Sequence, residues 1–312
     1  MLEIQNISVT YESKPLFTNL SLKIQRGEIV ALTGPSGSGK TTLLRCIAGL
    51  ETMSAGTILL NNNDITNHPA HKRRIGLVFQ DNQLFPHLNV SQNVGYSLKI
   101  QRVAKQTVVT KMREALDLVG LSHLADRSIS NLSGGEAKRI AVARALVAEP
   151  EVLLLDEPLG ALDAQLRARL QIELATLQRQ IGITFVYVTH DQHEAFTMSD
   201  RIGVMRDGRL MQVGAPRELY ESPNSVEVAQ FIGAANLISG EVTARGVVEF
   251  ANEKFVCSES APLGKGMMMI RPERIRIGSG SHKALIERVT FAGSSLRVAL
   301  KLGSATINAE VP

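Results

Sequence analysis

Apolar and polar residues alternate along two segments near the start of the chain, residues 2–11 and residues 20–24. This period of two predicts strands with one buried face. The next apolar segment, residues 27–34 (GEIVALTG), is continuous and ends in a glycine, which is typical of a strand buried on both faces. Residues 40–48 then have the pattern of a helix, and Gly49 stands where a helix C-terminus often has glycine.

The middle of the chain is helical, and an alternation of strands and helices then resumes. Residues 111–120 and 133–148 have the periodicity of amphipathic helices. Continuous apolar segments at 152–156 and 183–189 predict two more buried strands, and Asp163 is a good N-cap for the helix between them. Strands that alternate with helices in this way predict a largely parallel sheet covered by helices.

The last part of the chain has a different pattern. After about residue 235, short alternating segments such as residues 296–302 lie between glycine and serine clusters, which predicts a small all-β domain. We therefore expect two domains, residues 1–234, with a helical part at about 83–150, and residues 235–312. The second domain is either short or incompletely represented, and the sequence leaves both alternatives open.

Composition and charge narrow the class of protein. Of the 312 residues, 44% are apolar and 21% are charged, which excludes collagen-like and wholly disordered chains. The net charge of +4 is too small for a nucleic-acid-binding arm. Cys46 and Cys257 fit neither a zinc site nor a disulfide framework, and they favour a reduced, cytosolic compartment. Every apolar run is shorter than the ~18 residues that span a bilayer, so at a membrane other chains would have to supply the spanning helices.

A phosphate-binding motif follows the first continuous strand. It fits the pattern G-x-x-x-x-G-K-[ST], with a buried strand before it and a helix after it. Its residues are Gly34, Pro35, Ser36, Gly37, Ser38, Gly39, Lys40 and Thr41. The glycines allow backbone N–H groups to converge on phosphate oxygens, Lys40 can reach the β- and γ-phosphates, and the Thr41 hydroxyl suits Mg²⁺. A flexible glycine turn is the alternative, which the strand–helix context disfavours.

Two carboxylates stand at the end of the strand at 152–156. Asp156 can hold Mg²⁺ through water, and Glu157 can polarise the water that attacks a γ-phosphate. A strand that ends in Asp-Glu is common, and taken alone these residues are as easily two solvated loop acids. Beside a phosphate loop, the pair predicts hydrolysis of a nucleoside triphosphate.

A third motif, Leu132-Ser133-Gly134-Gly135-Glu136, opens a helix. Ser133 and Glu136 satisfy the capping box S-x-x-E, so the segment is at least a well-capped helix start. A capped N-terminus with two glycines also exposes N–H groups and the positive end of the helix dipole, which suits a γ-phosphate. That phosphate need not be the one bound by the phosphate loop of the same chain.

With these motifs in this order, the chain closely resembles the ATP-binding subunit of an ABC transporter. The resemblance covers about residues 1–235 and also rests on Gln80 in VFQDNQLFP, residues 160–163 (GALD) and His190 in VTHD. It implies an α/β P-loop NTPase domain with antiparallel β and helical subdomains, followed by a small all-β, OB-like domain. It also implies bound ATP and Mg²⁺, and two composite sites, each with the phosphate loop of one copy of the chain and residues 133–135 of the other.

The resemblance assigns roles to individual residues. The implied catalytic residues are Glu157, His190 and Gln80, and the implied contacts of Mg²⁺ are Thr41, Gln80 and Asp156. The implied nucleotide-binding residues are the phosphate loop (34–41), Thr42, Tyr11 stacked on adenine, Ser133, Gly134 and Gly135. Tyr11 and His190 taken alone are an ordinary strand aromatic and an ordinary surface or core histidine. Glu136 departs from the family's usual glutamine, and we expect the capping box to retain function while the carboxylate weakens binding of the partner's triphosphate.

Two functional classes share these motifs. A soluble ATPase of this superfamily that acts on nucleic acid or ribosomes usually carries a long coiled coil, zinc-bearing insertions or a second cassette, and this sequence has none of them. An exporter usually has its membrane helices in the same chain. The absence of such helices, together with an added β domain, resembles the ATPase of a bacterial importer. Residues 267–277 (MMMIRPERIRI) resemble the transport-associated OB-fold (TOBE) module of importers for metals, polyamines, sulfate or sugars, or are a generic strand rich in arginine.

The implied function is that of an ATPase subunit that drives import of a small solute through a separate permease, with a ferric ion or a polyamine as the favoured solute. Its implied partners are a second copy of itself, the permease subunits and, indirectly, a solute-binding protein, with no nucleic acid. Its implied location is peripheral, at the cytoplasmic face of the bacterial inner membrane. Residues 80–96 lie where family members accept a short helix of the membrane subunit, and Phe85, Pro86 and Leu88 are either exposed anchors there or core residues.

Overall fold

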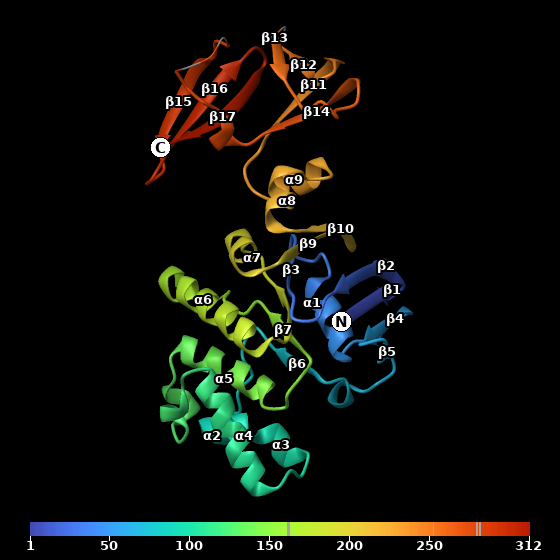
Figure 1. Cartoon of the computed structure of the whole chain (residues 1–312), viewed down its shortest axis with the longest axis vertical. Helices are drawn as coiled ribbons and strands as arrows, with labels where there is room; N and C mark the ends of the chain where they lie inside the picture. The colour runs from blue at the N-terminus through green and yellow to red at the C-terminus, as the bar shows by residue number, and fades with distance from the viewer. Residues whose placement is uncertain (161–162, 252, 279, 281) are drawn as a thin grey trace. The chain divides into compact units, whose positions relative to one another are not determined.

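The computed structural model of the chain describes residues 1–160, 163–251, 253–278, 280 and 282–312. These residues form two compact units, Met1–Glu218 and Leu219–Pro312 (Figure 1). Ala161 and Leu162 of the expected GALD motif lie outside the described residues. Among the residues that are described, no helix is long and apolar enough to cross a membrane.

The first unit alternates strands and helices, as the hydrophobic pattern predicts. Its elements in chain order are β1 (Leu2–Tyr11), β2 (Lys14–Ile24), β3 (Ile29–Thr33), α1 (Lys40–Ala48), β4 (Ala55–Leu60), β5 (Asn63–Asp64), β6 (Ile75–Val78), α2 (Val90–Val94), α3 (Tyr96–Ile100), α4 (Lys105–Leu118), α5 (Gly134–Leu146), β7 (Val152–Asp156), α6 (Ala164–Ile181), β8 (Thr184–Val188), α7 (Gln192–Met198), β9 (Arg201–Arg206) and β10 (Arg209–Gly214). The helix α8 (Pro216–Glu221) spans the division between the units.

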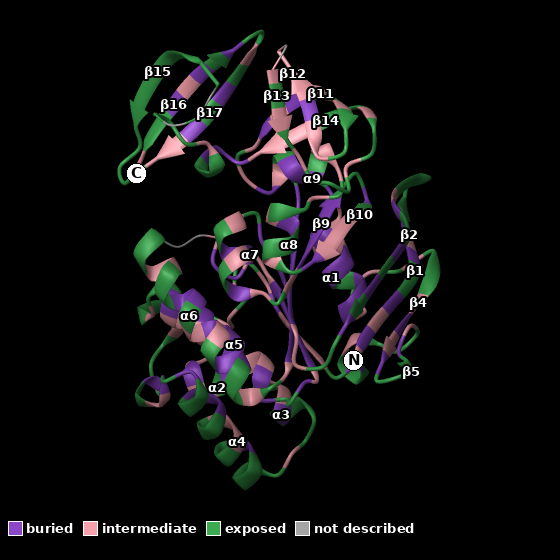
Figure 2. Ribbon diagram, turned by 45° about the horizontal axis from the view of Figure 1, so that its top comes forward, coloured by how far each residue is buried: buried purple, intermediate pink, exposed green. Residues whose placement is uncertain are grey.

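The larger sheet of the first unit has the strand order β10-β9-β3-β8-β7-β6, and every neighbouring pair except β10–β9 is parallel. All residues of β3 and β8 are buried, because helices cover both faces and the strands are continuous apolar runs. Figure 2 shows these strands as a buried centre. The predicted parallel sheet is confirmed.

A smaller antiparallel sheet, β2-β1-β4-β5, lies in the same unit. Its alternating burial confirms strands with one buried face. The helix α1 lies beside it (Figure 1), and Leu43, Leu44 and Ile47 share one core with residues of both sheets. This core fixes α1, and with it the loop that precedes α1.

The helical part and its caps follow the sequence closely. Between residues 83 and 150 the regular elements are helical, from α2 to α5, within the range where a helical part is expected. The helix α6 begins after Asp163, whose Oδ1 accepts a hydrogen bond from Leu166 N at 2.9 Å, and ends at Gly182 in the left-handed region with φ 67°. These caps are the ones that the sequence predicts.

The second unit is mostly β. It contains α9 (Val226–Phe231), β11 (Asn236–Ala244), β12 (Val247–Phe250), β13 (Glu253–Val256), β14 (Gly264–Ile270), β15 (Leu285–Phe291), β16 (Leu296–Leu302) and β17 (Ala305–Val311). The strand orders are β13-β12-β11-β14 and β15-β16-β17. Side chains from both sheets form its core, among them Ile238, Val298, Leu300 and Ile307.

The units divide earlier in the chain than residues 234/235, where the sequence places the boundary. The buried guanidinium of Arg271 donates hydrogen bonds to the carbonyl oxygens of Tyr220, Ala229, Gly233 and Ala234. These bonds join α9 and its flanks to the β strands of the second unit. The boundary at 234/235 stays a prediction for the domains as folding units.

Candidate functional site

The phosphate loop lies between the buried strand β3 and the helix α1. Gly34 has φ 151°, and a Cβ at this position would lie 2.0 Å from the carbonyl oxygen of Met205. Only glycine fits there, so the first glycine of the motif is required by the fold itself. Gly39, with φ 96°, caps α1 in the left-handed region, and Lys40 is the first residue of the helix.

The Lys40 ammonium is folded back on its own loop. Its Nζ donates hydrogen bonds to the carbonyl oxygens of Gly34 at 2.9 Å and Pro35 at 2.8 Å, and to the Ser38 hydroxyl at 3.3 Å. Burial lowers the pKa of Lys40, and the carboxylates of Glu157 and Asp156 oppose this effect. The charge is therefore held by neutral loop oxygens, and the nearest opposite charges are the two acids at the end of β7.

Thr41 and Asp156 bring two oxygen donors together. The Thr41 hydroxyl donates to Asp156 Oδ1 at 3.0 Å, joining the start of α1 to the end of β7. Burial raises the pKa of Asp156, the Glu157 charge adds to the rise, and the Thr41 hydrogen bond opposes it. Hydroxyl and carboxylate oxygens are donors that Mg²⁺ prefers. The described residues contain no group of three His, Cys, Asp or Glu side chains placed to hold a metal, so a metal here would rely on this pair, water and phosphate.

Gln80, Glu157 and His190 converge at one edge of the sheet. Gln80 Nε2 donates to Glu157 Oε2 at 2.9 Å, and His190 Nδ1 lies 3.5 Å from Glu157 Oε1. The three residues follow β6, β7 and β8, which are adjacent and parallel, so their carboxyl ends meet. Glu157 has φ 43°, a left-handed backbone that is uncommon outside glycine. Such conformations are often found at functional sites.

Tyr11 and Thr42 lie at the side of the phosphate loop. Tyr11 ends β1 and has an exposed side chain, 44% of its surface being accessible. Partial burial raises the pKa of the Tyr11 hydroxyl, the Glu51 carboxylate adds to the rise, and Thr42 opposes it. An accessible ring beside the first turn of α1 is free to stack on a flat ligand.

The helix α5 begins with a complete capping box. Ser133 Oγ accepts from Glu136 N at 3.3 Å, and Glu136 Oε2 accepts from Ser133 N at 2.7 Å. The Ser133 N–H bond lowers the pKa of Glu136, and the Ser133 hydroxyl adds to it. Ser133 and Gly134 are exposed, while Gly135 is buried against α6. Across the described ranges, no hydrogen bond joins residues 133–135 to the phosphate loop of the same chain.

Two basic residues of α5 that the sequence reasoning missed hold the loop around Gln80. Lys138 is 3% exposed, and its Nζ donates to the carbonyl oxygens of Phe79 at 3.1 Å and Gln80 at 3.4 Å. Arg144 donates to the carbonyls that follow, Gln83 at 2.7 Å and Asn82 at 2.8 Å. Burial lowers the pKa of Lys138 from 10.5 to about 8, and Asp156 opposes this effect.

The spacing along α5 carried a signal for Lys138. It stands three residues after Gly135 and three before Ala141, and all three are buried on one face of the helix. A lysine on the apolar face of a predicted helix is therefore the pattern that could have singled it out.

The segment expected to contact a membrane subunit is held by a buried asparagine. Asn93 Nδ2 donates to the carbonyls of Phe85 and Leu88, and its Oδ1 accepts from Phe85 N at 2.8 Å. The Phe85 ring lies 4.5 Å from that of Tyr96, between centroids. Phe85 and Leu88 are half-buried and Pro86 is exposed, which leaves both interpretations of this segment open.

Comparison with known proteins identifies the family. The family profile described as ABC transporter matches residues 17–160, and the profile described as TOBE domain matches residues 268–311. The spermidine/putrescine import ATP-binding protein PotA of Clostridium novyi is 43% identical over 306 residues, 96% of this chain and 88% of that protein. The protein of the same name from Haemophilus influenzae is 45% identical over 311 residues, 95% of this chain and 84% of that protein. This chain belongs to the ABC transporter family of ATP-binding proteins.

Solved structures agree with the assignment of this ABC cassette. A dimeric post-hydrolysis state of the ATP-binding cassette MJ0796, bound to ADP and Pi, is 31% identical, with a TM-score of 0.61 over 69% of this chain and 98% of that one. CbiO1 of Clostridium perfringens, part of an ABC transporter complex, is 33% identical, with a TM-score of 0.66 over 70% and 89% of the two chains.

The predicted class is therefore confirmed: the chain is an ABC-type ATPase with a P-loop domain followed by a small all-β TOBE domain. The roles of individual site residues stay predictions, now with a geometry to support them.

Proposed function

We propose that this ATPase drives polyamine import through a separate membrane permease, by binding and hydrolysing ATP between two copies of the chain. The observation that carries the proposal is the meeting of two sets of residues at the carboxyl edge of one parallel sheet. Lys40, Thr41 and Asp156 form the phosphate and metal set, and Glu157 with its two neighbours Gln80 and His190 forms the water set.

The residues present fit ATP and Mg²⁺. Gly34 and Gly39 have the positive φ values that turn backbone N–H groups inward. Among the described residues, the hydrogen-bond partners of the Lys40 ammonium are neutral oxygens, which it can exchange for phosphate oxygens. Thr41 and Asp156 would hold Mg²⁺, Asp156 through water, with Gln80 as a further oxygen donor. When bound, Mg²⁺ would neutralise charge on the β- and γ-phosphates.

The water set would position the nucleophile. Glu157 would accept a proton from the attacking water, whose oxygen forms a bond to the γ-phosphorus. The bond to the β,γ-bridging oxygen breaks at the same time, and ADP leaves with its electron pair. Gln80 holds one carboxylate oxygen of Glu157 at 2.9 Å, and His190 lies beside the other. The exposed imidazole of His190 can turn to the γ-phosphate. Catalysis here depends mainly on position and on charge stabilisation.

The second half of each site would come from a second copy. Ser133 and Gly134 are exposed, and within the part of the chain that the structure describes they make no bond to their own phosphate loop. The solved cassette MJ0796 is dimeric in its state with ADP and Pi. Both observations support a head-to-tail homodimer.

The names of the relatives support the choice of substrate. The Clostridium novyi and Haemophilus influenzae proteins are named for spermidine and putrescine import, which favours a polyamine over a ferric ion and transport over action on nucleic acid or ribosomes. Import requires permease subunits and, through them, a solute-binding protein. The proposed assembly would have the chain at the periphery of the cytoplasmic face of the bacterial inner membrane.

The test of the chemistry uses Glu157→Gln, with Lys40→Ala as a contrasting variant and Glu149→Gln as a matched control. Glu149 is exposed and pairs with Lys111 at 2.8 Å. We expect Glu157→Gln to bind Mg-ATP, to hydrolyse it at least about 100-fold more slowly than wild type, and to accumulate as a dimer in analytical ultracentrifugation. Lys40→Ala should lose nucleotide affinity, and Glu149→Gln should match wild type. Wild-type turnover in Glu157→Gln, or a monomer at saturating Mg-ATP with its permease present, would refute the scheme.

The substrate is tested separately. The wild-type chain and its permease in proteoliposomes should take up labelled spermidine or putrescine only with ATP, and ferric ion should not compete. ATP-dependent uptake of ferric ion without polyamine uptake would reverse the substrate assignment and leave the ATPase mechanism standing.

A further inference from the structure

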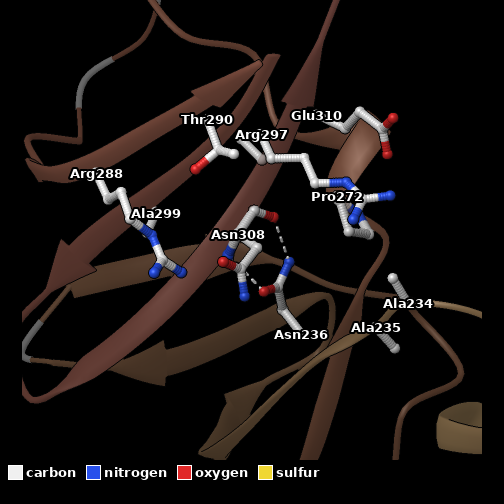
Figure 3. A pocket seen from close by; sticks show the side chains of 11 residues that line it. Ala234, Ala235, Asn236, Pro272, Arg288, Thr290, Arg297, Ala299, Asn308 and Glu310 are labelled. Carbon is white, nitrogen blue, oxygen red and sulfur yellow. Dashed lines mark hydrogen bonds between the residues drawn. The ribbon is translucent and has the colours of Figure 1, made fainter. Parts of the chain in front are cut away.

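A pocket lies within the second unit, remote in sequence from every residue proposed to bind nucleotide. It has a volume of about 560 Å³. Figure 3 shows Arg288 and Arg297 reaching into it to either side of Asn308, with Thr290 beside Arg297. This volume falls in the ~300–1,000 Å³ range of small-molecule sites.

The register of the sheet places both arginines on one face. Arg288 on β15 pairs with Ala299 on β16, and Thr290 pairs with Arg297. Residues two apart on a strand and residues directly opposite on neighbouring strands share a face, so these side chains point the same way. The opposite face of β16 carries Val298 and Leu300, which are buried in the core. On β16 a slip by one residue would bury Arg297 in place of Val298, so the face that carries Arg297 is strongly specified.

The floor of the pocket is preformed. Asn236, 5% exposed, donates through Nδ2 to the carbonyl oxygens of Asn308 at 2.8 Å and Ile270 at 3.2 Å, and its Oδ1 accepts from Asn308 N at 2.6 Å. Figure 3 shows this paired contact at the base of the pocket. It ties β17 to the start of β11, so the floor does not depend on a ligand for its shape.

The charges of the pocket are unbalanced. In the described part of the chain, neither Arg288 nor Arg297 has an ion pair or a side-chain hydrogen bond, whereas Arg245 and Arg274 of the same unit pair with glutamates. The pocket has one carboxylate, Glu310, whose Oε1 accepts the Ser295 hydroxyl at 2.6 Å. Glu310 stands directly opposite Arg297 in the β16–β17 register, so its charge offsets one of the two guanidinium charges. The N–H donors of both guanidinium groups are left to a ligand or to water.

We propose that this pocket binds a small organic dianion, one that carries two carboxylates or a phosphomonoester. Guanidinium groups match carboxylate and phosphate oxygens geometrically, and two of them on one face select for a ligand with two negative groups or one doubly charged group. The Thr290 hydroxyl supplies a further donor or acceptor. A bare inorganic ion would leave most of the volume empty, and a polyamine would be repelled by the arginines.

The test is isothermal titration calorimetry on the whole chain without nucleotide, at low ionic strength, with succinate, glycerol 3-phosphate and inorganic phosphate as probes. We expect saturable binding of at least one organic dianion. Whether the bound probe is a carboxylate or glycerol 3-phosphate decides between the two sources of charge. Arg288→Gln and Arg297→Gln should each weaken it about tenfold, and the double variant more than about 100-fold.

Arg276→Gln is the matched control, because Arg276 is an exposed arginine of the same unit outside the pocket. It should bind the probe like wild type. The proposal is overturned if no organic dianion binds, if only inorganic phosphate binds, or if the double variant binds as tightly as Arg276→Gln. None of these outcomes depends on ATP hydrolysis or transport.

Discussion

Lys138 connects the helix that begins with Ser133 to the loop that carries Gln80, and the substitution Lys138→Met tests that connection. Methionine keeps most of the volume and removes the charge and both hydrogen bonds, to Phe79 O at 3.1 Å and Gln80 O at 3.4 Å. Lys138 is 3% exposed, so its charge is poorly solvated. Two opposing effects on stability follow.

The cost of burying the Lys138 charge and the contribution of its hydrogen bonds are of similar size. The fall of the Lys138 pKa from 10.5 to about 8 corresponds to about 3 kcal/mol of cost for keeping the charge in the folded state at neutral pH. A hydrogen bond from a charged donor contributes about 1.5–3 kcal/mol, and the variant loses two of them. The loss of about 3–6 kcal/mol is largely offset by the gain of about 3 kcal/mol, so we expect the free energy of unfolding to fall by at most about 3 kcal/mol at pH 7.

Turnover should respond much more than stability. The Lys138 bonds hold the loop that positions Gln80. If losing one of them raises the activation free energy of hydrolysis by about 1.5 kcal/mol, the rate falls about tenfold. We expect kcat for ATP hydrolysis to fall about 10- to 100-fold in Lys138→Met, with KM for ATP nearly unchanged because Lys40 and its loop are untouched. Lys138→Gln keeps a donor and should recover part of the loss. Lys111→Met, which removes a surface ion pair to Glu149, is the control and should match wild type.

The pH dependence distinguishes a buried charge from a merely structural side chain. Between about pH 8 and pH 10.5 the unfolded chain binds the Lys138 proton and the folded chain does not, so the stability of wild type relative to Lys138→Met should rise by about 3 kcal/mol over that range. The chain has no tryptophan, so urea unfolding is followed by far-ultraviolet circular dichroism. A difference that is flat with pH, or turnover within twofold of wild type in Lys138→Met, would refute the reasoning.

Three further predictions follow from single contacts. Gly34→Ala should abolish nucleotide binding, measured by equilibrium dialysis of labelled ATP, because its Cβ would lie 2.0 Å from Met205 O; retained affinity would contradict the assigned loop geometry. Glu136→Gln should change ATPase activity less than tenfold, because glutamine keeps the capping acceptor, and a larger change would mean that the carboxylate acts directly on the triphosphate. Glu194 is 3% exposed, and burial raises its pKa from 4.5 to about 6, so the folded state binds a proton that the unfolded state has lost. As the pH rises from about 4.5 to 6, the stability of wild type in urea unfolding should therefore fall by about 2 kcal/mol relative to Glu194→Gln, and no relative change would contradict this prediction.

Local pattern was sufficient to predict most of the fold, because each element carries its own signal. The continuous run before Gly34 is the buried strand β3, and the predicted cap and stop of α6 are both present. The phosphate loop has a pattern tied to its backbone conformation, so it could be placed without tertiary knowledge. The boundary between the units could not, because it depends on hydrogen bonds from Arg271 to carbonyls up to 51 residues earlier in the chain.

The contacts between residues of the site that are distant in sequence could not be predicted from local sequence pattern. That Gln80, Glu157 and His190 follow strands is readable from the sequence, but that these strands are neighbours depends on the order β8-β7-β6, which is a property of the whole sheet. The role of Lys138 was hidden because lysine is usually a surface residue, and its partners are backbone carbonyls, which have no signature in a sequence. Thr41 and Asp156 were each predicted as Mg²⁺ contacts from their own motifs, but the hydrogen bond between them depends on the packing of α1 against β7.

The helix α5 gives a physical reason why two sites should work together. Its tip, Ser133, is the part proposed to meet the ATP of a second copy, and Lys138, five residues further on, holds the Gln80 loop of the copy's own site. Five residues of helix span about 7.5 Å, and an intact helix of this length moves as one body. A displacement of the tip by the partner's nucleotide must therefore move the Lys138 ammonium, and with it the carbonyl of Gln80. Since Gln80 Nε2 donates to the Glu157 carboxylate at 2.9 Å, occupancy of one site is expected to change the position of the carboxylate proposed to activate water in the other.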